Sequence, residues 1–233
     1  MIPNVFDFLS LMSDFFRFKS MEGSRRLPIN FKDIRLYKEG KSQQSSFDAH
    51  YVYHTSWAAR ILARIAPKEH VDISSSLYFV GLVSAFIPVK FYDYRLVHLS
   101  LKGATIGTAD LTSLLFPDAS IPSLSCMHVV EHIGLGRYGD PIDPNGDLKA
   151  MSELKRVLSK GGDLLFVVPI GFPKIVFHAH RIYSFAQIQQ CFHDLKLMEF
   201  MLVCDDASVV FNASEDLANS QKYGCGCFWF RKE

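Results

Sequence analysis

The chain has 233 residues, of which 48% are hydrophobic and 21% charged, and this composition is typical of a folded globular protein rather than a disordered one. Its length suits one sizeable α/β domain with a small extension. The formal net charge of +1 lacks the basic excess of proteins that bind nucleic-acid phosphates. We therefore expect no nucleic-acid partner, and we expect the protein to bind its substrate through local sites.

The N-terminal residues 2–18 are apolar but are interrupted by Asp7, Asp14 and Arg17. This segment is too short and too charged to span a bilayer, and it lacks the basic start and small-residue cleavage site of a signal peptide. An amphipathic helix is predicted by apolar residues at helical spacing, namely Val5, Phe8, Leu9, Met12 and Phe16. We expect this helix to pack on the domain or on a partner chain, such as a second copy; association with a membrane surface is the alternative.

The five cysteines are odd in number and have no spacing typical of a disulfide framework or a zinc site. Cys225 and Cys227 alternate along a predicted strand, which favours a role in packing. The cysteine usage fits a reducing, cytoplasmic compartment.

A regular alternation of elements begins at residue 51, so we divide the chain into an extension, residues 1–50, and an α/β domain, residues 51–233. Helices are predicted over 51–66, 76–87, 145–162 and 184–195. Strands are predicted over 70–74, 89–94, 104–110, 121–130, 163–170, 197–206 and 224–232. The alternation predicts a mostly parallel, seven-stranded sheet with helices on both faces. The last strand should be antiparallel, because no long helix precedes it.

The stretch HVVEHIGLGRYG, residues 128–139, fits two motifs at once. His128, Glu131 and His132 form H-x-x-E-H, the pattern of inverted zinc peptidases. A zinc site of that kind would need both histidines on one sustained helix and a further ligand downstream. Here an apolar strand precedes the motif and glycines follow within one turn. A zinc hydrolase is therefore a minor alternative, and no metal ligand is predicted.

The same stretch contains Gly134, Gly136 and Gly139 in the pattern G-x-G-x-x-G. A dinucleotide-binding fingerprint lies between the first strand and a helix that starts at once. These glycines follow the fourth predicted strand instead, and Pro141 and Pro144 prevent a helix from starting there. We interpret the segment as a polar loop above the ligand-binding end of the sheet, and an NAD-dependent enzyme is the weakest alternative.

Several features follow one another in an informative order. Asp72, Asp93 and Asp110 end the first three strands, H-x-x-E-H ends the fourth, and the next helix closes on ELKRVLSKGG before a strand ending in VP. This order resembles the class I S-adenosylmethionine-dependent methyltransferases, especially those with an HVLEHI-like segment and an RVLKPGG-like helix end. The segments HVVEHIGLGRYGDPIDP, HVDIS and AHRIYS are similar to a methyltransferase-like family of unknown function. The resemblance covers roughly residues 48–206.

The resemblance implies a Rossmann-like class I methyltransferase fold and S-adenosylmethionine as cofactor. The cofactor-binding residues that it implies are Asp72, Ser74, Ser76, Asp93, Tyr94, Ala109, Asp110 and Leu111. Asp93 lies at the interval after Asp72 that suits a carboxylate accepting from both ribose hydroxyls. Asp110 would accept a hydrogen bond from the exocyclic amine of adenine.

The first loop departs from the methyltransferase pattern, because Ser74, Ser75 and Ser76 stand where glycines are usual. Serine tolerates a positive φ poorly, and its side chain occupies space beside the ligand. A second hypothesis therefore stays open: a binding or scaffold protein that has the fold without catalysis.

The remaining expectations concern the cleft. His128 is expected to act as a general base, since an imidazole at the end of the fourth strand would face the acceptor, and Glu131 or His132 would orient it. The acceptor-binding residues are predicted to be Arg137, Tyr138, Asp140, His180 and Arg181. The leading hypothesis is methyl transfer to a small molecule, or to a sugar or phosphorylated glycan precursor.

Overall fold

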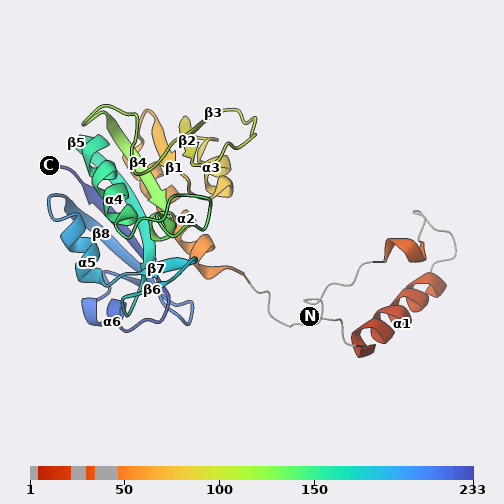
Figure 1. The fold of residues 1–233 in the computed structure, drawn as a ribbon. Coiled ribbons are helices and arrows are strands. Elements are labelled where there is room, and N and C mark those ends of the chain that lie inside the picture. The colour runs from red at the N-terminus through yellow and green to blue at the C-terminus, as the bar shows by residue number, and fades with distance from the viewer. Residues whose placement is uncertain (1–4, 22–29, 35–46) are drawn as a thin grey trace. The chain divides into compact units, whose positions relative to one another are not determined.

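The structure is a computed structural model that describes residues 5–21, 30–34 and 47–233 (Figure 1). The chain divides into two compact units, Met1–Phe47 and Asp48–Glu233. In the first unit, the predicted amphipathic helix is confirmed as α1 (Val5–Met21), and a short 3-10 helix, η1 (Phe31–Asp33), follows. Residues 1–4, 22–29 and 35–46 of the predicted extension lie outside the described residues. None of the described helices is both long and apolar enough to cross a membrane.

An eight-stranded sheet forms the centre of the second unit (Figure 1). In spatial order its strands are β3 (Ala104–Thr108), β2 (Val89–Asp93), β1 (His70–Ile73), β4 (Ile121–Met127), β5 (Leu158–Ile170), β10 (Gly224–Arg231), β8 (Lys196–Val203) and β9 (Val209–Phe211). The first five are parallel to one another. Strand β10 is antiparallel to both β5 and β8. The prediction of a mostly parallel sheet with an antiparallel last strand is therefore confirmed.

The sheet has one strand more than the seven predicted. Strand β9 pairs antiparallel with β8 at the edge of the sheet. Its three residues follow a tight turn in which Ala207 has a φ of +65°, and so short a run shows no recognisable alternation in the sequence. A separate two-stranded hairpin, β6 (Lys174–Val176) with β7 (His180–Ile182), was likewise not predicted.

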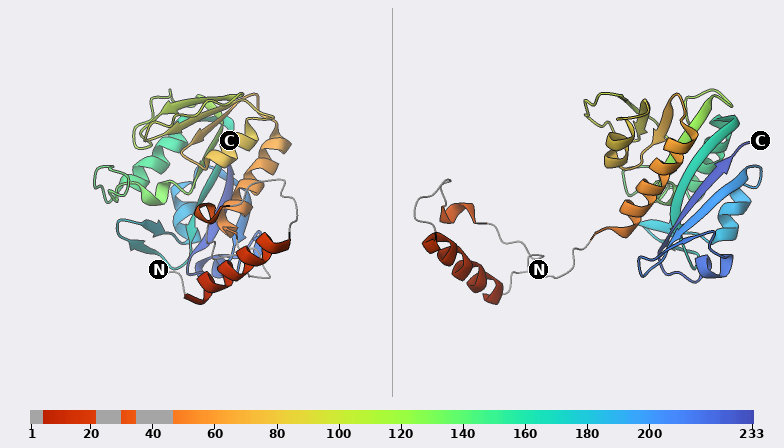
Figure 2. Two further views of the ribbon diagram at one scale, coloured as in Figure 1. Left: turned by 90° about the vertical axis from the view of Figure 1, so that its right-hand side faces the viewer. Right: turned by 180° about the vertical axis from the view of Figure 1, so that it is seen from behind.

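Helices cover both faces of the sheet, as predicted (Figures 1 and 2). They are α2 (Ala49–Ile65), α3 (Leu77–Val83), α4 (Gly146–Val157), α5 (Phe185–Cys191), α6 (Glu215–Asn219) and the 3-10 helix η2 (Val130–His132). Buried side chains of α2 and α3 share one core with one face of the sheet. Those of α4, α5 and α6 belong to the core on the other face.

Local sequence explains where several helices begin. The side chain of Asp48 accepts a hydrogen bond from the backbone N–H of Tyr51 and caps α2, which places Trp57, Ile61 and Leu62 on its buried face. A capping box of Ser184 with Gln187 begins α5.

Several predicted boundaries were wrong. Helix α4 ends at Val157 instead of near Gly161, because Leu158 adopts an extended backbone and pairs with Ile121 at the start of β5. Helix α3 is shorter than predicted. It is also not buried throughout, since Tyr78 on its outer side is 87% exposed.

Strand β4 stops at Met127, three residues earlier than predicted. His128 has a φ of +57°, a left-handed conformation that a strand cannot continue. This break positions the following residues of the H-x-x-E-H segment above the end of the sheet.

Candidate active site

The loops at the carboxyl ends of the parallel strands enclose a cavity of about 830 Å³. Small-molecule sites in proteins commonly measure about 300 to 1,000 Å³, so the volume suits a ligand of cofactor size. The sheet side of the cavity includes Ser74 after β1, Asp93 at the end of β2 and His128 after β4. The start of α2 and Tyr223 contribute to the wall as well.

Most of the sequence-predicted site residues meet in this wall. Those that line it are Ser74, Asp93, Tyr94, Ala109, Asp110, Leu111, His128, Glu131, His132, Arg137, Tyr138 and Asp140. Those that do not are Asp72, Ser76, His180 and Arg181. Segments that are far apart in the sequence therefore converge where the resemblance places cofactor and acceptor.

Ser74 adopts the backbone conformation for which glycine is usual. Its φ is +57°, its backbone N–H donates to the carbonyl of Tyr92 at 2.7 Å, and its hydroxyl reaches the same carbonyl at 3.2 Å. A left-handed conformation costs an L-residue about 1 to 2 kcal/mol. The first loop thus makes the turn that glycine-rich loops make, although it carries the Ser74 side chain at the cavity wall.

Asp72 lies inside the sheet, fully buried, instead of in the cavity wall. Its carboxylate accepts hydrogen bonds from the Ser75 backbone N–H at 3.1 Å and from the Ser125 hydroxyl. Burial raises the pKa of Asp72 to about 6, although these hydrogen bonds oppose the shift. Asp72 therefore stabilises the first loop from inside the sheet, through its hydrogen bond with the Ser75 backbone.

The hydrogen bonds continue through a buried histidine. Since Ser125 donates to Asp72, its oxygen is left to accept from His70 Nε2 at 2.8 Å, and His70 Nδ1 then accepts from Ser123 at 2.8 Å. Burial lowers the pKa of His70 to about 3, so this ring is neutral. These contacts give hydrogen-bond partners to four buried side chains within the sheet, those of Asp72, Ser125, His70 and Ser123.

Asp93 and Asp110 are each held at the edge of the cavity by residues two positions further along. Asp93 Oδ1 accepts from the Arg95 backbone N–H at 2.9 Å. Asp110 Oδ1 accepts from the backbone N–H and the hydroxyl of Thr112, at 2.8 and 2.7 Å. These contacts fix the two carboxylates at the ends of neighbouring strands, where a nucleoside would need hydrogen-bond acceptors.

His128 and Glu131 form a buried pair at the end of β4. His128 Nδ1 lies 2.9 Å from Glu131 Oε1, and Glu131 is fully buried in η2. Burial opposes a charge on His128, but the neighbouring Cys225 sulfur and the Glu131 carboxylate outweigh it and raise the pKa of His128. Within residues 47–233, His128 Nε2 and Glu131 Oε2 are buried without a hydrogen-bond partner.

Rings from α2 surround His128. The His50 ring stacks on it with centroids 5.5 Å apart, Tyr51 lies at 5.8 Å and His54 meets it edge-on at 5.1 Å. Tyr223 stacks on His50 at 5.2 Å. Sequence reasoning missed these residues, although the four-residue spacing of His50 and His54 places both on one side of a helix.

His132 does not face the same point as His128. Its Nδ1 lies 2.5 Å from the carbonyl oxygen of Ala179, and its Nε2 is 3.8 Å from Glu131 Oε1. The two histidines of H-x-x-E-H therefore approach Glu131 Oε1 through different ring nitrogens, His128 through Nδ1 and His132 through Nε2.

The glycines of the overlapping motif shape the loop that follows. Gly134 has a φ of +78°, and a Cβ there would lie 2.1 Å from the carbonyl oxygen of Asp143. Asp140 accepts from the backbone N–H groups of Gly134 at 2.7 Å and Tyr138 at 3.1 Å. Partial burial opposes its charge, but these hydrogen bonds prevail and lower the pKa of Asp140. Asp140 thus organises the loop whose outer residues line the cavity.

Arg181 anchors this loop instead of lining the cavity. Its guanidinium donates to the carbonyl of Ile133 at 2.6 Å and lies 3.5 Å from the carboxylate of Asp147. The Tyr183 hydroxyl also donates to Asp147, at 3.0 Å. His180 lies outside the cavity too, with its ring 4.8 Å from that of Tyr223.

Two cavity cations, Arg95 and Lys149, had no sequence signal. The guanidinium carbons of Arg95 and of the predicted Arg137 lie 4.9 and 5.1 Å from the centre of the Tyr138 ring. Lys149, on α4, lines the cavity and pairs with Asp143 at 2.7 Å. These cations share the cavity wall with the carboxylates of Asp140 and Asp143.

Comparison with known proteins extends these observations. Residues 120–222 match a family described as Caenorhabditis protein of unknown function, DUF268. No curated protein matches the sequence.

Solved structures match over most of the chain. A Burkholderia thailandensis 1,6-didemethyltoxoflavin-N1-methyltransferase, with S-adenosylhomocysteine bound, is 10% identical at a TM-score of 0.54, covering 78% of this chain and 79% of that one. A TehB-like SAM-dependent methyltransferase from Corynebacterium glutamicum is 15% identical at a TM-score of 0.50, covering 76% of this chain and 87% of that one. The cyclase SpnF is 12% identical at a TM-score of 0.57, covering 76% of this chain and 81% of the cyclase. The chain therefore has the Rossmann-like fold of the class I S-adenosylmethionine-dependent methyltransferases.

Proposed function

We propose that the protein is an S-adenosylmethionine-dependent methyltransferase that acts on a small molecule. The observation that carries this proposal is the convergence of Ser74, Asp93, Asp110 and His128 on one cavity at the carboxyl ends of the parallel strands. Ligands of open α/β sheets bind at this edge. The fold of the chain and the volume of the cavity support the same conclusion.

The residues that would hold the cofactor follow from their positions. Asp93 would accept hydrogen bonds from the ribose hydroxyls and Asp110 from the adenine amine, while Ser74 and the backbone after β1 would face the methionine part. Asp72 supports this loop through Ser75. Bound S-adenosylmethionine supplies a methyl group activated by its positively charged sulfur.

His128 and Glu131 would position the acceptor. Glu131 fixes the orientation of the imidazole at the cavity wall through Nδ1. Because Nε2 of His128 is buried, the geometry supports alignment of the acceptor better than the expected role as general base. Displacement at a methyl group depends strongly on such alignment.

The acceptor would be a sugar, a phosphorylated glycan precursor or a similar small anion-bearing molecule. Arg95 and Arg137 would bind phosphate or carboxylate oxygens, for which the planar guanidinium is suited. Incubation with S-adenosylmethionine labelled in its methyl group and a panel of sugar phosphates tests this assignment. Arg137→Ala should then raise the KM for any sugar phosphate that the protein methylates.

Calorimetric titration of S-adenosylmethionine tests the proposal. Asp93→Ala should weaken binding by about 1 to 3 kcal/mol, or roughly 5- to 150-fold, because charge-assisted hydrogen bonds to the ribose are lost. Asp118→Ala is the matched control, since Asp118 is an exposed aspartate that pairs with Arg156 outside the cavity. Equal affinity in wild type and Asp93→Ala would count against this placement.

One observation favours a second candidate, a non-catalytic binding protein with the same fold. Ser74 places a hydroxymethyl group in the wall where a glycine would leave room. The structural likeness to SpnF, described as a cyclase, also shows that the fold alone does not require methyl transfer. Binding of S-adenosylmethionine without transfer to any acceptor of the panel would favour this candidate.

A further inference from the structure

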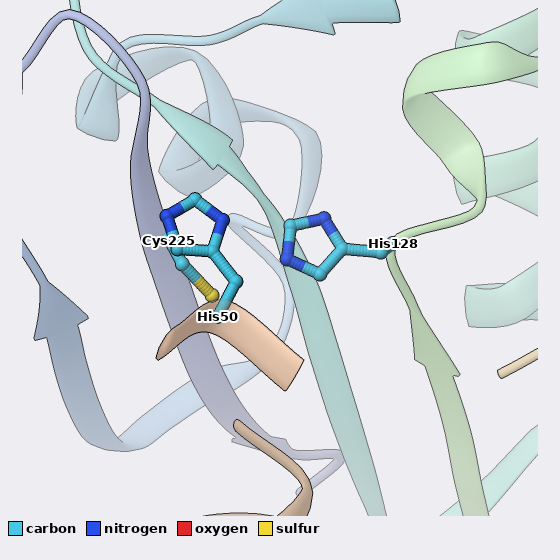
Figure 3. A group of neighbouring side chains, drawn as sticks. All are labelled: His50, His128 and Cys225. Atoms are coloured by element: carbon cyan, nitrogen blue, oxygen red, sulfur yellow. The ribbon is translucent and has the colours of Figure 1, made fainter. Parts of the chain in front are cut away.

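Three side chains from separate segments form a cluster of metal-ligand type. Across residues 5–21, 30–34 and 47–233, one group of His, Cys, Asp or Glu side chains has donor atoms close enough to share a metal ion: His50, His128 and Cys225. These atoms all lie within 4.8 Å of one another. As Figure 3 shows, His50 comes from the start of α2, His128 from the loop after β4 and Cys225 from β10.

The orientation of His128 is that of a metal ligand. Its Nδ1 contacts the Glu131 carboxylate at 2.9 Å, which leaves Nε2 as the lone-pair nitrogen directed at the cluster. That nitrogen is buried and has no hydrogen-bond partner in the described part of the chain. Histidines that bind metals commonly use one nitrogen for the metal and donate the other to a carboxylate, which fixes the ring. Glu131 fills this second role.

The donor set and spacing suit zinc. Imidazole nitrogen and thiolate sulfur are its common ligands, with bonds of about 2.0 to 2.3 Å that place neighbouring donors about 3.3 to 3.6 Å apart in a tetrahedral site. Small side-chain rotations would close a cluster no wider than 4.8 Å to this spacing. Cys227 lies on the same strand, its sulfur 3.7 Å from that of Cys225, but it is not one of the three.

We propose that His50, His128 through Nε2 and Cys225 through its sulfur bind a zinc ion. Three protein ligands leave an open coordination position. His50 and His128 line the cavity, so this position would take an oxygen, nitrogen or sulfur donor of the molecule bound there. The site differs from the H-x-x-E-H pattern, because His132 contacts Ala179 and faces Glu131 instead. It stands independently of the proposed function, because metal binding needs neither cofactor nor acceptor.

Metal analysis of the full chain tests the site. The protein is stripped with a chelator, reloaded with zinc chloride or cobalt chloride alone, and freed of excess metal. We expect one zinc per chain by mass spectrometry. The cobalt form should show a thiolate-to-cobalt charge-transfer band in the near ultraviolet, which requires a cysteine ligand. Failure to retain either metal, or cobalt binding without that band, would overturn the proposal.

Matched variants assign the ligands. Cys225→Ala and His50→Gln should lower zinc affinity at least tenfold, whereas Cys227→Ala and His132→Gln should retain wild-type affinity and the cobalt band. Circular dichroism establishes that each variant is folded; if Cys225→Ala is not, the wild-type cobalt spectrum still decides. Zinc retained by folded Cys225→Ala but lost by His132→Gln would overturn the proposal in favour of the H-x-x-E-H pattern.

Discussion

Two residues at the cavity hold backbone conformations that their side chains disfavour. Ser74 and His128 both have a φ of +57°, and they follow β1 and β4 at the carboxyl edge of the sheet. Strained residues of this kind persist where the surrounding structure determines them, and they concentrate at binding and catalytic sites. Their shared position is independent support for a functional cavity at this edge.

Ser74→Gly should improve cofactor binding without harming the fold. Glycine removes a left-handed cost of about 1 to 2 kcal/mol but loses about 0.5 to 1 kcal/mol in backbone entropy, so the free energy of unfolding should stay equal or rise by up to about 1.5 kcal/mol. Calorimetry should show tighter S-adenosylmethionine binding, because the hydroxymethyl group leaves the cavity wall. Ser76→Gly, outside the cavity, is the control and should leave affinity unchanged. Weaker binding by Ser74→Gly would refute the placement of the cofactor beside this loop.

The buried ionisable groups predict how stability depends on pH. Burial lowers the pKa of His54 and His70 from 6.5 to about 3, so the unfolded chain takes up their protons first and stability is lost as pH falls below 6.5. Burial raises the pKa of Asp72 from 3.8 to about 6, which works in the opposite direction: its contribution is lost as pH rises through 6. Between about pH 4 and 6, the two histidines therefore outweigh the aspartate.

Asp72→Asn should steepen the loss of stability in acid. With all three groups present, the free energy of unfolding should fall by about 1.4 kcal/mol per pH unit as pH decreases from 6 to 4, and without Asp72 by about 2.7 kcal/mol. Urea unfolding at a series of pH values measures both slopes. Asp118→Asn, at an exposed position, should keep the wild-type slope. A shallower slope in Asp72→Asn would show that this carboxyl group does not retain its proton in the folded chain.

At the scale of elements, the loop after η2 owes its position to a buried ion pair. Arg181 on β7 bonds the carbonyl of Ile133 and contacts Asp147 at the start of α4. The loop between these two points carries Arg137 and Tyr138 into the cavity wall. Arg181 therefore determines the shape of the cavity without facing it.

Arg181→Met should destabilise the protein by about 3 to 5 kcal/mol, because it leaves the Asp147 carboxylate buried without its cation. The matched control is Lys149→Met, which breaks the exposed pair with Asp143 and should cost no more than about 1 kcal/mol. Chemical denaturation measures both free energies. Similar small losses in the two variants would contradict the anchoring role of Arg181.

The predicted elements succeeded where local patterns are strong. The apolar run of β5, the capping box of Ser184 and the amphipathic pattern of α1 all lie within short windows of sequence. Boundaries failed where tertiary pairing decides: Leu158 continues a helical pattern but joins β5 because Ile121 lies opposite it. Strand β9 was missed because three residues carry no periodic signal.

At the scale of the whole molecule, the site depends on contacts that no local pattern encodes. The resemblance placed Asp93, Asp110 and His128 at one edge of the sheet, and the structure brings them into one cavity. His50 and Cys225 join His128 only because α2 crosses the face of the sheet on which the Cys225 side chain is buried. Arg181, in contrast, looked accessible in sequence, and its burial follows from the unpredicted hairpin that carries it.

We infer that this cavity takes S-adenosylmethionine. A crystal structure of the full chain with S-adenosylhomocysteine tests it most directly, because the map locates the ligand as well as detecting it. We predict the ribose within hydrogen-bonding distance of Asp93, the adenine beside Asp110 and the amino-acid part over Ser74. Ligand density elsewhere on the molecule, or none at saturating concentration, would contradict the account.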